Sequence, residues 1–449
     1  MSNLNIYQQA RLSRDPRFDG QFFIAVKTTH IFCRSICPAN LPLEKNVEYF
    51  LLAQQAMQHG YRPCLRCRPD SAPKSYAWQG VSTTVMRASQ LLHSHLELTI
   101  GDIAEKLGIG ERYFRHLFKS QIGLSPKQYQ LYDQILLAKK LLHHSNLSVE
   151  HIAQSCGFNS ARRLQLQMKK QCKLTPSQLR KKPPRIEQNI QLSMSFRPPY
   201  DWRQVRDFLA LRAIERIELV TSDSYARFFT FENEKGWFKA TYDESKSQFQ
   251  LQIKLNTITL LPKIIANIER QLDVNADAIN IEKSLLASGI HSEQVNRGIR
   301  IPGIWNTFEA GCRAILGQQI SVKAAIKLLT LLSHTLGDSS DDALYFPSSE
   351  RIAASDLAFL KIPASRRATL RNFANWYSCN PNADVGEWLK LKGIGPWTIA
   401  YVQLRALSMP DVWLNTDLVI KNQLKKYSIS AEAARPWRSY LTLQLWTLA

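Results

Sequence analysis

Four cysteines near the N-terminus form two close pairs. Cys33 and Cys37 are separated by three residues, Cys64 and Cys67 by two, and 26 residues lie between the pairs. Two sulfurs this close along the chain can reach one ion from a single turn, and four thiolates suit tetrahedral Zn²⁺. We therefore predict that these residues bind zinc. Four unrelated reduced thiols are the alternative for the metal, and a purely structural zinc finger is the alternative for the chemistry.

A glycine-flanked turn precedes an acidic residue near the C-terminus. Gly393 and Gly395 stand on either side of Ile394, a pattern typical of the turn in a helix-hairpin-helix. Glycines there let backbone N–H groups approach a DNA phosphate, which gives a contact independent of base sequence. Asp417 follows this turn. A single aspartate between a loop and a helix is usually an N-cap, so that structural role is the alternative to a chemical one.

The charge of the chain favours a polyanionic partner. Its 449 residues, enough for about two to four domains, carry 58 Lys and Arg against 37 Asp and Glu, a net charge of +21. Residues 81–185 hold 17 basic and 6 acidic side chains, which is +11 of that total. The alternative explanation for this basic segment is a solvent-exposed surface without a binding role, but the helical periodicity of the segment favours DNA binding.

The composition also excludes several classes of protein. With 45% hydrophobic and 21% charged residues, the chain is neither collagen-like, nor largely disordered, nor a disulfide scaffold. No apolar run reaches the roughly 18 residues of a membrane span, and the N-terminus lacks the basic-then-apolar start of a signal peptide. We expect a cytoplasmic, nucleoid-associated protein with reduced thiols.

The patterning divides the chain into segments that must position these residues. Residues 1–80 mix short apolar runs with turn residues and predict a small α/β domain. Residues 81–182 have helical spacing and a diverged repeat offset by about 49 residues, in which Gly108 and Gly157 stand where a helix-turn-helix needs positive φ. Prolines and basic residues predict a linker at 183–189. Residues 190–285 alternate like antiparallel strands, and residues 286–449 are mainly helical.

The segments around the cysteines, Thr28–Ala39 and Tyr61–Asp70, closely resemble the N-terminal domain of the Ada family of DNA-methylation responders, over nearly all of residues 5–75. The resemblance implies that Cys33 takes a methyl group from a DNA methylphosphotriester in one irreversible turnover. A metal that holds thiolates deprotonated makes this chemistry reasonable. Methylation removes one negative charge from the site, so affinity for DNA should rise. Asn40 stands where the family commonly has Arg, which leaves Arg34, Arg66 and Arg68 as candidate phosphate contacts.

The repeated unit, which includes Gly123–Tyr129, resembles the AraC-type DNA-binding domain and spans about 85–182. The resemblance implies an all-α domain with two recognition helices, which by spacing begin near Gly110 and Ser160. A helical bundle with a basic solvated surface is the alternative. The second copy has Arg163-Leu164 where the family more often has Tyr-Phe. The residues expected to face DNA are Glu111, Arg112, Arg115, Ala161, Arg162 and Arg163.

The hairpin turn followed by Asp417, twenty residues after Trp397, resembles the signature of the helix-hairpin-helix DNA glycosylases, and residues 190–449 resemble the AlkA type in particular. The resemblance implies an α+β part, then a mainly helical body. It implies that Asp417 stabilises the oxocarbenium-like state and guides water after base flipping. An aromatic pocket would bind cationic alkylated purines by stacking and cation–π attraction. The residues expected to line it are Trp397, Tyr401, Trp446 and Gln319.

Four differences from related patterns bear on the reaction. Trp397 stands where members with lyase activity carry Lys, so no Schiff base can form there and we predict a monofunctional glycosylase. The last cysteine is Cys379, before Asp417, so no iron–sulfur cluster is expected. Gln319 stands where the best-known pattern has a bulky apolar side chain, a wedge that fills the gap left in the duplex by the flipped base. Pro-Cys-His-Arg occurs nowhere, so reversal of O6-methylguanine is not predicted.

These observations predict a multidomain fusion. A zinc methylphosphotriester sensor at 1–80 and an AraC-type domain at 81–182 would activate transcription at promoter DNA with RNA polymerase. A glycosylase with a β-sheet part at 190–285 and a helix-hairpin-helix body at 286–449 would excise bases such as 3-methyladenine from double-stranded DNA. The alternative is a DNA-binding regulator whose glycosylase half is inactive. A third reading keeps the glycosylase and makes the zinc domain structural.

Overall fold

The computed structural model divides the chain into two compact units. One comprises residues 1–143 and 149–181, and the other comprises residues 144–148 and 182–449. The structure describes residues 4–448, except 15–17, 20–21, 38, 52–54, 57–58, 65–66, 68, 70–83, 86, 90, 93–97, 181–188 and 341–342. The predicted linker at 183–189 therefore lies almost wholly outside the described residues. None of the helices in the described ranges is both long enough and apolar enough to cross a membrane.

The N-terminal part of the first unit is a small α/β domain. Its elements are α1 (Leu4–Ser13), β1 (Phe23–Val26), β2 (Ile31–Arg34), η2 (Glu44–Asn46), β3 (Val47–Phe50) and β4 (Arg62–Pro63). The sheet has the order β3-β1-β2-β4, in which β2 and β4 run parallel. Parallel strands end at the same edge of a sheet. This pairing therefore brings one cysteine of each sequence pair, Cys33 on β2 and Cys64 after β4, to one edge.

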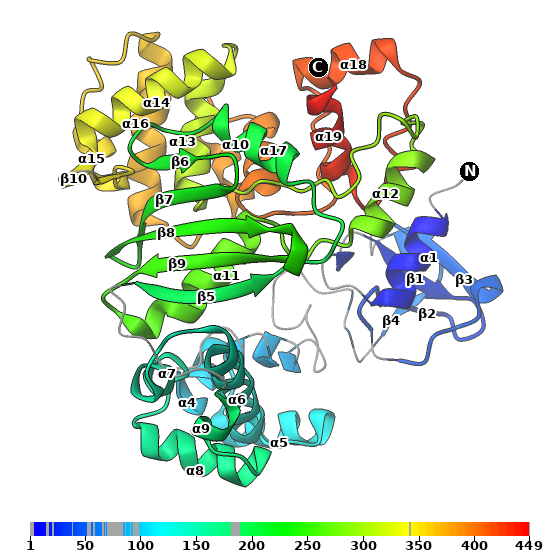
Figure 1. Cartoon of the computed structure of the whole chain (residues 1–449). Coiled ribbons are helices and arrows are strands. Elements are labelled where there is room, and N and C mark those ends of the chain that lie inside the picture. Colours follow the sequence, from blue (N-terminus) through cyan, green and yellow to red (C-terminus); the bar gives the residue numbers. More distant parts are fainter. Residues whose placement is uncertain are drawn as a thin grey trace. The chain divides into compact units, whose positions relative to one another are not determined.

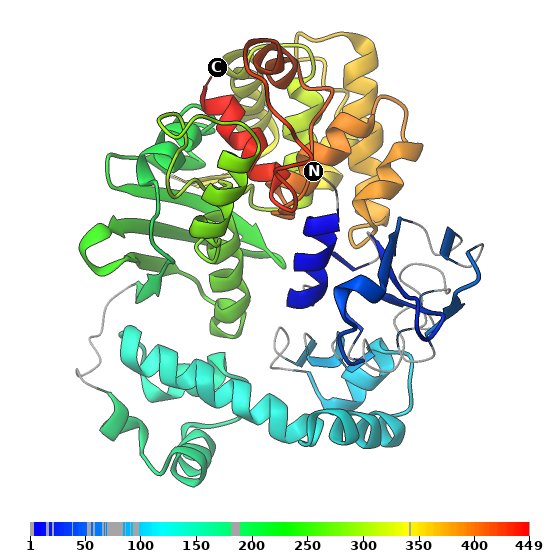
Figure 2. The ribbon, with the colours of Figure 1, turned by 90° about the vertical axis from the view of Figure 1, so that its right-hand side faces the viewer.

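In the rest of the first unit, the described residues from 84 to 180 are mainly helical, as the repeat predicts. The helices are α4 (Ile100–Lys106), α5 (Glu111–Ile122), α6 (Pro126–His144), α7 (Val149–Ser155), α8 (Ala161–Cys172) and α9 (Pro176–Leu179). Gly108 and Gly157 have φ of +69° and +74° in the two turns, the conformation that glycine adopts without strain. From α6, buried Gln130 donates to Leu98 O (2.9 Å) and buried Gln134 donates to Gly157 O (3.3 Å). The long helix, drawn in cyan and teal in Figure 2, thus holds both helix-turn-helix copies.

A five-stranded antiparallel sheet opens the second unit. Its strands are β5 (Ile190–Ser195), β6 (Glu218–Val220), β7 (Ser224–Phe231), β8 (Glu234–Asp243) and β9 (Gln248–Lys254), in the order β5-β9-β8-β7-β6 (Figure 1). The predicted alternation holds, since Phe249, Leu251 and Ile253 are buried while their neighbours are not. Helix α10 (Trp202–Ala210) joins β5 to β6. Helix α11 (Leu261–Gln271) packs on one face, where Gln271 donates to the Tyr225 hydroxyl at 2.8 Å.

The body of the second unit is mainly helical. Its elements are η3 (Glu244–Lys246), η4 (Ile258–Leu260), α12 (Ala278–Ala287), α13 (Thr307–Gly317), α14 (Val322–Leu336), β10 (Asp338–Ser340), β11 (Ala343–Tyr345), α15 (Ser349–Ala354), α16 (Ala364–Cys379), η5 (Val385–Lys390), α17 (Pro396–Arg405), α18 (Leu418–Lys426) and α19 (Arg438–Thr447). One apolar core joins α13 to α16 and α17, and another joins α12 to α19. Helix α17 borders both cores, which fixes the helix that follows the hairpin turn.

Candidate functional sites

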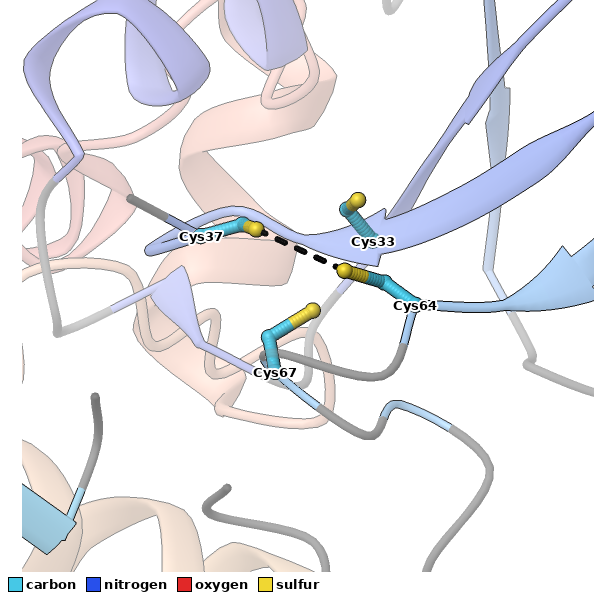
Figure 3. Close-up of side chains that lie close together, drawn as sticks. All are labelled: Cys33, Cys37, Cys64 and Cys67. Atoms are coloured by element: carbon cyan, nitrogen blue, oxygen red, sulfur yellow. Dashed lines mark hydrogen bonds between the residues drawn. The ribbon is translucent and has the colours of Figure 1, made fainter. Parts of the chain in front are cut away.

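The four predicted metal ligands lie together. The Sγ atoms of Cys33, Cys37, Cys64 and Cys67 are all within 4.8 Å of one another, and Figure 3 shows them grouped around one position. Cys37 and Cys64 Sγ are 3.9 Å apart. Sulfurs around a tetrahedral zinc lie about 3.8 Å apart, given Zn–S bonds of about 2.3 Å. The donor set and its spacing fit Zn²⁺.

The environment of Cys33 differs from that of its three partners. Its side chain is half-buried, whereas Cys37, Cys64 and Cys67 are buried. Interaction with the Cys37 thiol, together with burial, raises the pKa of the Cys33 thiol well above its ordinary value. A metal cation bound by these four sulfurs would act in the opposite direction and favour the thiolate. Cys33 is the ligand that a substrate can reach.

A hollow of about 550 Å³ opens beside Cys33. Its lining includes Thr28, Thr29, Asn40 and Arg62. Asn40 and Arg62 are exposed, and Arg62 is a cation that the sequence reasoning did not select, although it neighbours a cysteine pair. These side chains surround the accessible ligand with hydrogen-bond donors.

The predicted phosphate contacts of this domain have different surroundings. Arg34 is 2% exposed, forms an ion pair with Asp19, and donates its Nη1 to the Cys67 carbonyl at 3.4 Å. It would have to leave Asp19 to reach a phosphate, so in this structure it supports the cysteine cluster instead. Arg66 and Arg68 lie outside the described residues.

Asp417 is held by four hydrogen-bond donors at the N-terminus of α18. Its Oδ1 accepts from Val419 N (3.0 Å) and Ile420 N (3.2 Å) as an N-cap, and also from Trp446 Nε1 (3.3 Å). Its Oδ2 accepts from Trp397 Nε1 (3.1 Å). The residue is the expected N-cap and also faces a pocket. The N-cap role is thus observed, the chemical role stays a prediction, and Oδ2 keeps an acceptor position for a bound group.

Two aromatic stacks flank this carboxylate. Trp397 and Tyr401 stack with ring centroids 5.3 Å apart on α17, and Trp446 on α19 stacks on Phe208 at 6.1 Å. Each tryptophan therefore supplies a π-face to the pocket region and an N–H to Asp417. Phe208 was not selected from the sequence, because nothing near position 208 marks it as different from a core residue.

The predicted base-binding residues surround one cavity of about 920 Å³. Its lining includes Asp417, Trp397, Tyr401, Trp446 and Gln319, so the structure brings all five together. Their roles in binding and catalysis stay predictions. Gln319 is exposed and has φ +57°, which lies in the left-handed region. The next residue, Ile320, is also in the lining and 37% exposed. An apolar side chain thus stands beside the glutamine that replaces the expected wedge.

Two arginines in the cavity wall were missed by the sequence reasoning. Arg212 lies with its guanidinium 3.7 Å from the centroid of the Phe208 ring, and burial lowers its pKa to about 10. Arg313 donates to the Arg212 carbonyl at 2.8 Å, to Glu309 at 2.9 Å and to Glu218 at 2.5 Å. The pocket wall therefore rests on a buried ionic network between the sheet and α13.

That network is electrically balanced. Arg227 on β7 donates to Glu309 on α13 at 2.8 Å and lies 3.8 Å from Glu218 on β6. All four charged groups are at most 7% exposed. Burial opposes ionisation of Glu218, but Arg313 and Arg227 outweigh it and lower its pKa to about 2. Glu309 and Arg313 are an i,i+4 pair on α13, but their partners Glu218 and Arg227 lie far away in the sequence, so local spacing shows only part of this network.

The hairpin turn has one glycine position that cannot take a side chain and one that can. Gly393 has φ +91°, and a Cβ there would lie 2.1 Å from Thr369 Oγ1. At Gly395, which precedes α17 with no side-chain cap, a Cβ would meet nothing within 4 Å. Ile394 between them is buried. The turn is anchored by its apolar residue and leaves open space beside Gly395, as a phosphate contact requires.

The expected DNA-facing residues lie on α5 and α8. Arg112, Arg115, Arg162 and Arg163 are exposed. Arg115 forms an ion pair with Glu111 one turn earlier, while Ala161 is half-buried. Leu164 and Met168 are fully buried, so the second copy packs despite its departure from the usual pattern.

Three family models match the chain. The metal binding domain of Ada matches residues 7–70, a helix-turn-helix domain matches residues 103–182, and the AlkA N-terminal domain matches residues 191–306. The order of these matches along the chain agrees with the order of the described elements.

Curated relatives match the whole chain and its parts. The "Probable bifunctional transcriptional activator/DNA repair enzyme AlkA" of Mycobacterium tuberculosis is 29% identical, over 97% of this chain and 94% of its own length. The "DNA-3-methyladenine glycosylase 2" of Escherichia coli is 31% identical, over 57% of this chain and 96% of its own. The "Bifunctional transcriptional activator/DNA repair enzyme AdaA" of Bacillus subtilis is 31% identical, over 38% and 80%. The chain belongs to the family of fusion proteins in which an Ada-type zinc-binding domain and an AraC-type helix-turn-helix domain precede an AlkA-type glycosylase.

Proposed function

We propose that this chain is a bifunctional transcriptional activator and DNA repair enzyme. It senses methylphosphotriesters through Cys33 and excises alkylated bases such as 3-methyladenine from DNA. The observation that carries the enzymatic half is the Asp417 carboxylate, held by two indole N–H groups at the edge of an aromatic cavity. The family and its relatives support both halves.

Base excision needs a stabilised cation on the sugar. With the base flipped into the cavity, the Asp417 carboxylate faces the C1′ carbon as its bond to the base nitrogen breaks, and a negative charge in a partly dehydrated site stabilises the oxocarbenium-like state. Water then adds to C1′ and gives its proton to the carboxylate. The N-cap and indole donors hold Asp417 in place, which avoids reorganisation. The rings of Trp397, Tyr401 and Trp446 bind the cationic base by stacking.

The excision stops at the abasic site. Trp397 occupies the position where a lyase would present an amine, and an indole forms no Schiff base. We therefore assign a monofunctional glycosylase.

The second activity is transfer of a methyl group to Cys33. Cys33, Cys37, Cys64 and Cys67 would hold Zn²⁺, which keeps their thiols deprotonated at neutral pH. The Cys33 sulfur attacks the methyl carbon of the phosphotriester. An S–C bond forms, the C–O bond breaks, and the electron pair leaves with the phosphodiester oxygen. Asn40 and Arg62 line the cavity where that phosphate would lie.

Activation of transcription would follow from α5 and α8. The sensor, the DNA-binding domain and the two glycosylase parts correspond to residues 1–80, 81–182, 190–285 and 286–449. Exposed arginines on α5 and α8 fix the protein on promoter DNA, and RNA polymerase is the partner that an activator recruits.

Two measurements test this proposal. Purified protein should release 3-methyladenine from alkylated duplex DNA, and Asp417→Asn should not, because Asn keeps the N-cap but lacks the charge. Mass spectrometry after exposure to methylated DNA should find a methyl adduct on Cys33. If the wild type releases no base, the chain is a DNA-binding regulator with an inactive glycosylase half. If no methyl adduct forms on Cys33, the zinc domain is purely structural.

A further inference from the structure

Helix α18 carries a solvent face whose role the excision chemistry does not explain. The helix begins directly after its N-cap Asp417 and contains three lysines and no acidic residue. Its buried side is formed by Ile420 and Gln423, which are 0% and 2% exposed. Each residue advances the direction on a helix by about 100°, which defines the opposite side. The side chains on that side, here called the α18 face, are all exposed: Leu418, Lys421, Asn422 and Lys425.

Leu418 begins the α18 face at the catalytic cavity. It is 70% exposed, more than any other large apolar side chain among the described residues. It also belongs to the lining of the cavity, next to Asp417. An apolar side chain in water at the mouth of a cavity is stabilised by burial only when a ligand covers it. Its place therefore indicates a partner that reaches the cavity across α18.

Lys421 and Lys425 continue the α18 face away from the cavity. The rise of a helix places Lys421 about 4.5 Å beyond Leu418 along the axis, and Lys425 about 6 Å further. Both lysines are exposed, and within the described ranges neither of them pairs with a carboxylate. Unpaired cations in a row beside a cavity for a damaged nucleotide complement the phosphates of the strand that carries this nucleotide.

The α18 face is joined to the catalytic carboxylate through one helical turn. The N–H groups of Val419 and Ile420 donate to Asp417 Oδ1 at 3.0 and 3.2 Å. These two residues lie between Leu418 and Lys421 in the sequence, so the turn that holds Asp417 also holds the start of the face. A DNA backbone bound along the α18 face is therefore kept at a fixed distance from the carboxylate.

Resting on the proposed glycosylase function, we propose that the α18 face is a DNA-binding surface. Leu418 packs against the flipped nucleotide at the mouth of the cavity, and Lys421 and Lys425 bind phosphates of the damaged strand beside it. Such contacts do not depend on the base sequence. They are additional to the phosphate contact expected at the hairpin turn.

The test measures binding by the full-length, zinc-loaded protein. The probe is a duplex with one cationic pyrrolidine in place of the damaged nucleotide, which imitates the oxocarbenium-like sugar and carries no base to release. Footprinting at the pyrrolidine measures affinity there, so binding of the other domains elsewhere on the duplex is not counted. The double variant Lys421→Gln, Lys425→Gln should reduce the slope of log affinity against log salt by about 1.8, because each phosphate contact contributes about 0.9.

Neutral phosphates locate these contacts on the DNA. Replacing single phosphates by methylphosphonates removes one negative charge at a time. The wild type should lose affinity when the contacted phosphates beside the pyrrolidine are replaced, and the double variant should be insensitive at those positions. Leu418→Ala should bind at least about fourfold more weakly with an unchanged salt slope, because the side chain loses at least one buried CH₂ group.

Lys426→Gln is the matched control. Lys426 is exposed on the same helix, but it lies about 100° around the axis from Lys425 and outside the α18 face. The substitution removes the same charge and should keep the affinity and the salt slope of the wild type. At saturating protein, the double variant should release 3-methyladenine from alkylated duplex DNA at the wild-type rate, because its two lysines act on binding.

The outcomes separate this inference from the function on which it rests. If the double variant keeps the wild-type salt slope, or if Lys426→Gln reduces the slope as much, the α18 face does not bind the backbone and the inference is wrong. Slower base release at saturating protein would place the two lysines in support of Asp417 and would also overturn it. In these cases, excision by the wild type leaves the proposed function intact. If the wild type neither prefers the pyrrolidine duplex nor releases a base, the proposed function fails and the inference fails with it.

Discussion

Replacement of Glu218 by glutamine should reveal how much the buried ionic network stabilises the glycosylase unit. The ordinary pKa of this carboxyl is 4.5, and its arginine partners lower it to about 2 in the folded protein. Each pH unit in that interval corresponds to about 1.4 kcal/mol, so ionised Glu218 contributes roughly 3 kcal/mol of the free energy of unfolding. Because the folded pKa is depressed, the contribution is present above about pH 5 and is lost as the pH falls towards 2.

The substitution itself should cost about as much at neutral pH. Glutamine keeps the volume of the side chain but leaves Arg313 and Arg227 with one carboxylate between them. Removing one partner of a buried pair costs about 3–5 kcal/mol. Glu218→Gln should therefore unfold at a lower urea concentration at pH 7, and its unfolding free energy should change less than that of the wild type between pH 5 and pH 2.

Tryptophan fluorescence is the assay, because nine of the ten tryptophans lie within residues 190–449 and report on this unit in the full-length protein. Glu232 is the matched control, since its carboxylate is 53% exposed and pairs with Lys263 at 3.0 Å. Glu232→Gln should cost at most about 1 kcal/mol. If the pH profiles of Glu218→Gln and the wild type run parallel below pH 5, the pairing does not stabilise the unit and the reasoning is wrong.

Three further predictions concern the sites directly. Trp446→Phe keeps the aromatic ring over Phe208 but removes a hydrogen bond to the charged Asp417 carboxylate, which is worth about 1.5–3 kcal/mol. Single-turnover base release should therefore slow by at least about tenfold. An unchanged rate would show that this donor does not support Asp417. Gly393→Ala should lower the melting temperature, because this position has a positive φ and the new Cβ contacts Thr369. Gly395→Ala should keep the melting temperature of the wild type and weaken binding to duplex DNA. Equal melting temperatures of the two variants would contradict this difference. Chelation of zinc should abolish methyl transfer to Cys33 and leave base release intact, because the two sites lie in separate units; loss of both activities would contradict that independence.

The sequence was informative where chemistry depends on local spacing. The two cysteine pairs, the hairpin glycines and the N-cap position of Asp417 are each set within a few residues, so their geometry could be predicted. The order of helical and strand-like segments followed from periodicity in the same way.

The rest of the glycosylase site depends on long-range packing. Arg212 and Arg313 reach the cavity wall because Arg313 on α13 bonds to the Arg212 carbonyl, just after α10, and to Glu218 on β6. Trp446 became a donor to Asp417 because α19 packs beside α18. Arg34 looked like a surface cation, but a partner fifteen residues away buries it. Such partners leave no periodic signal.

The dual use of Asp417 has a consequence for how this protein can change during evolution. The carboxylate caps α18 with the same atom that accepts the Trp446 N–H. Asparagine caps a helix about as well as aspartate, so a single exchange can remove the catalytic charge while the helix keeps its cap. Selection for the helix cap alone cannot detect that loss, since the exchange takes away only the acceptor of the Trp397 N–H on Oδ2. A descendant can therefore become a pure DNA-binding regulator in one step, and selection for repair is the main force that keeps the acid in place.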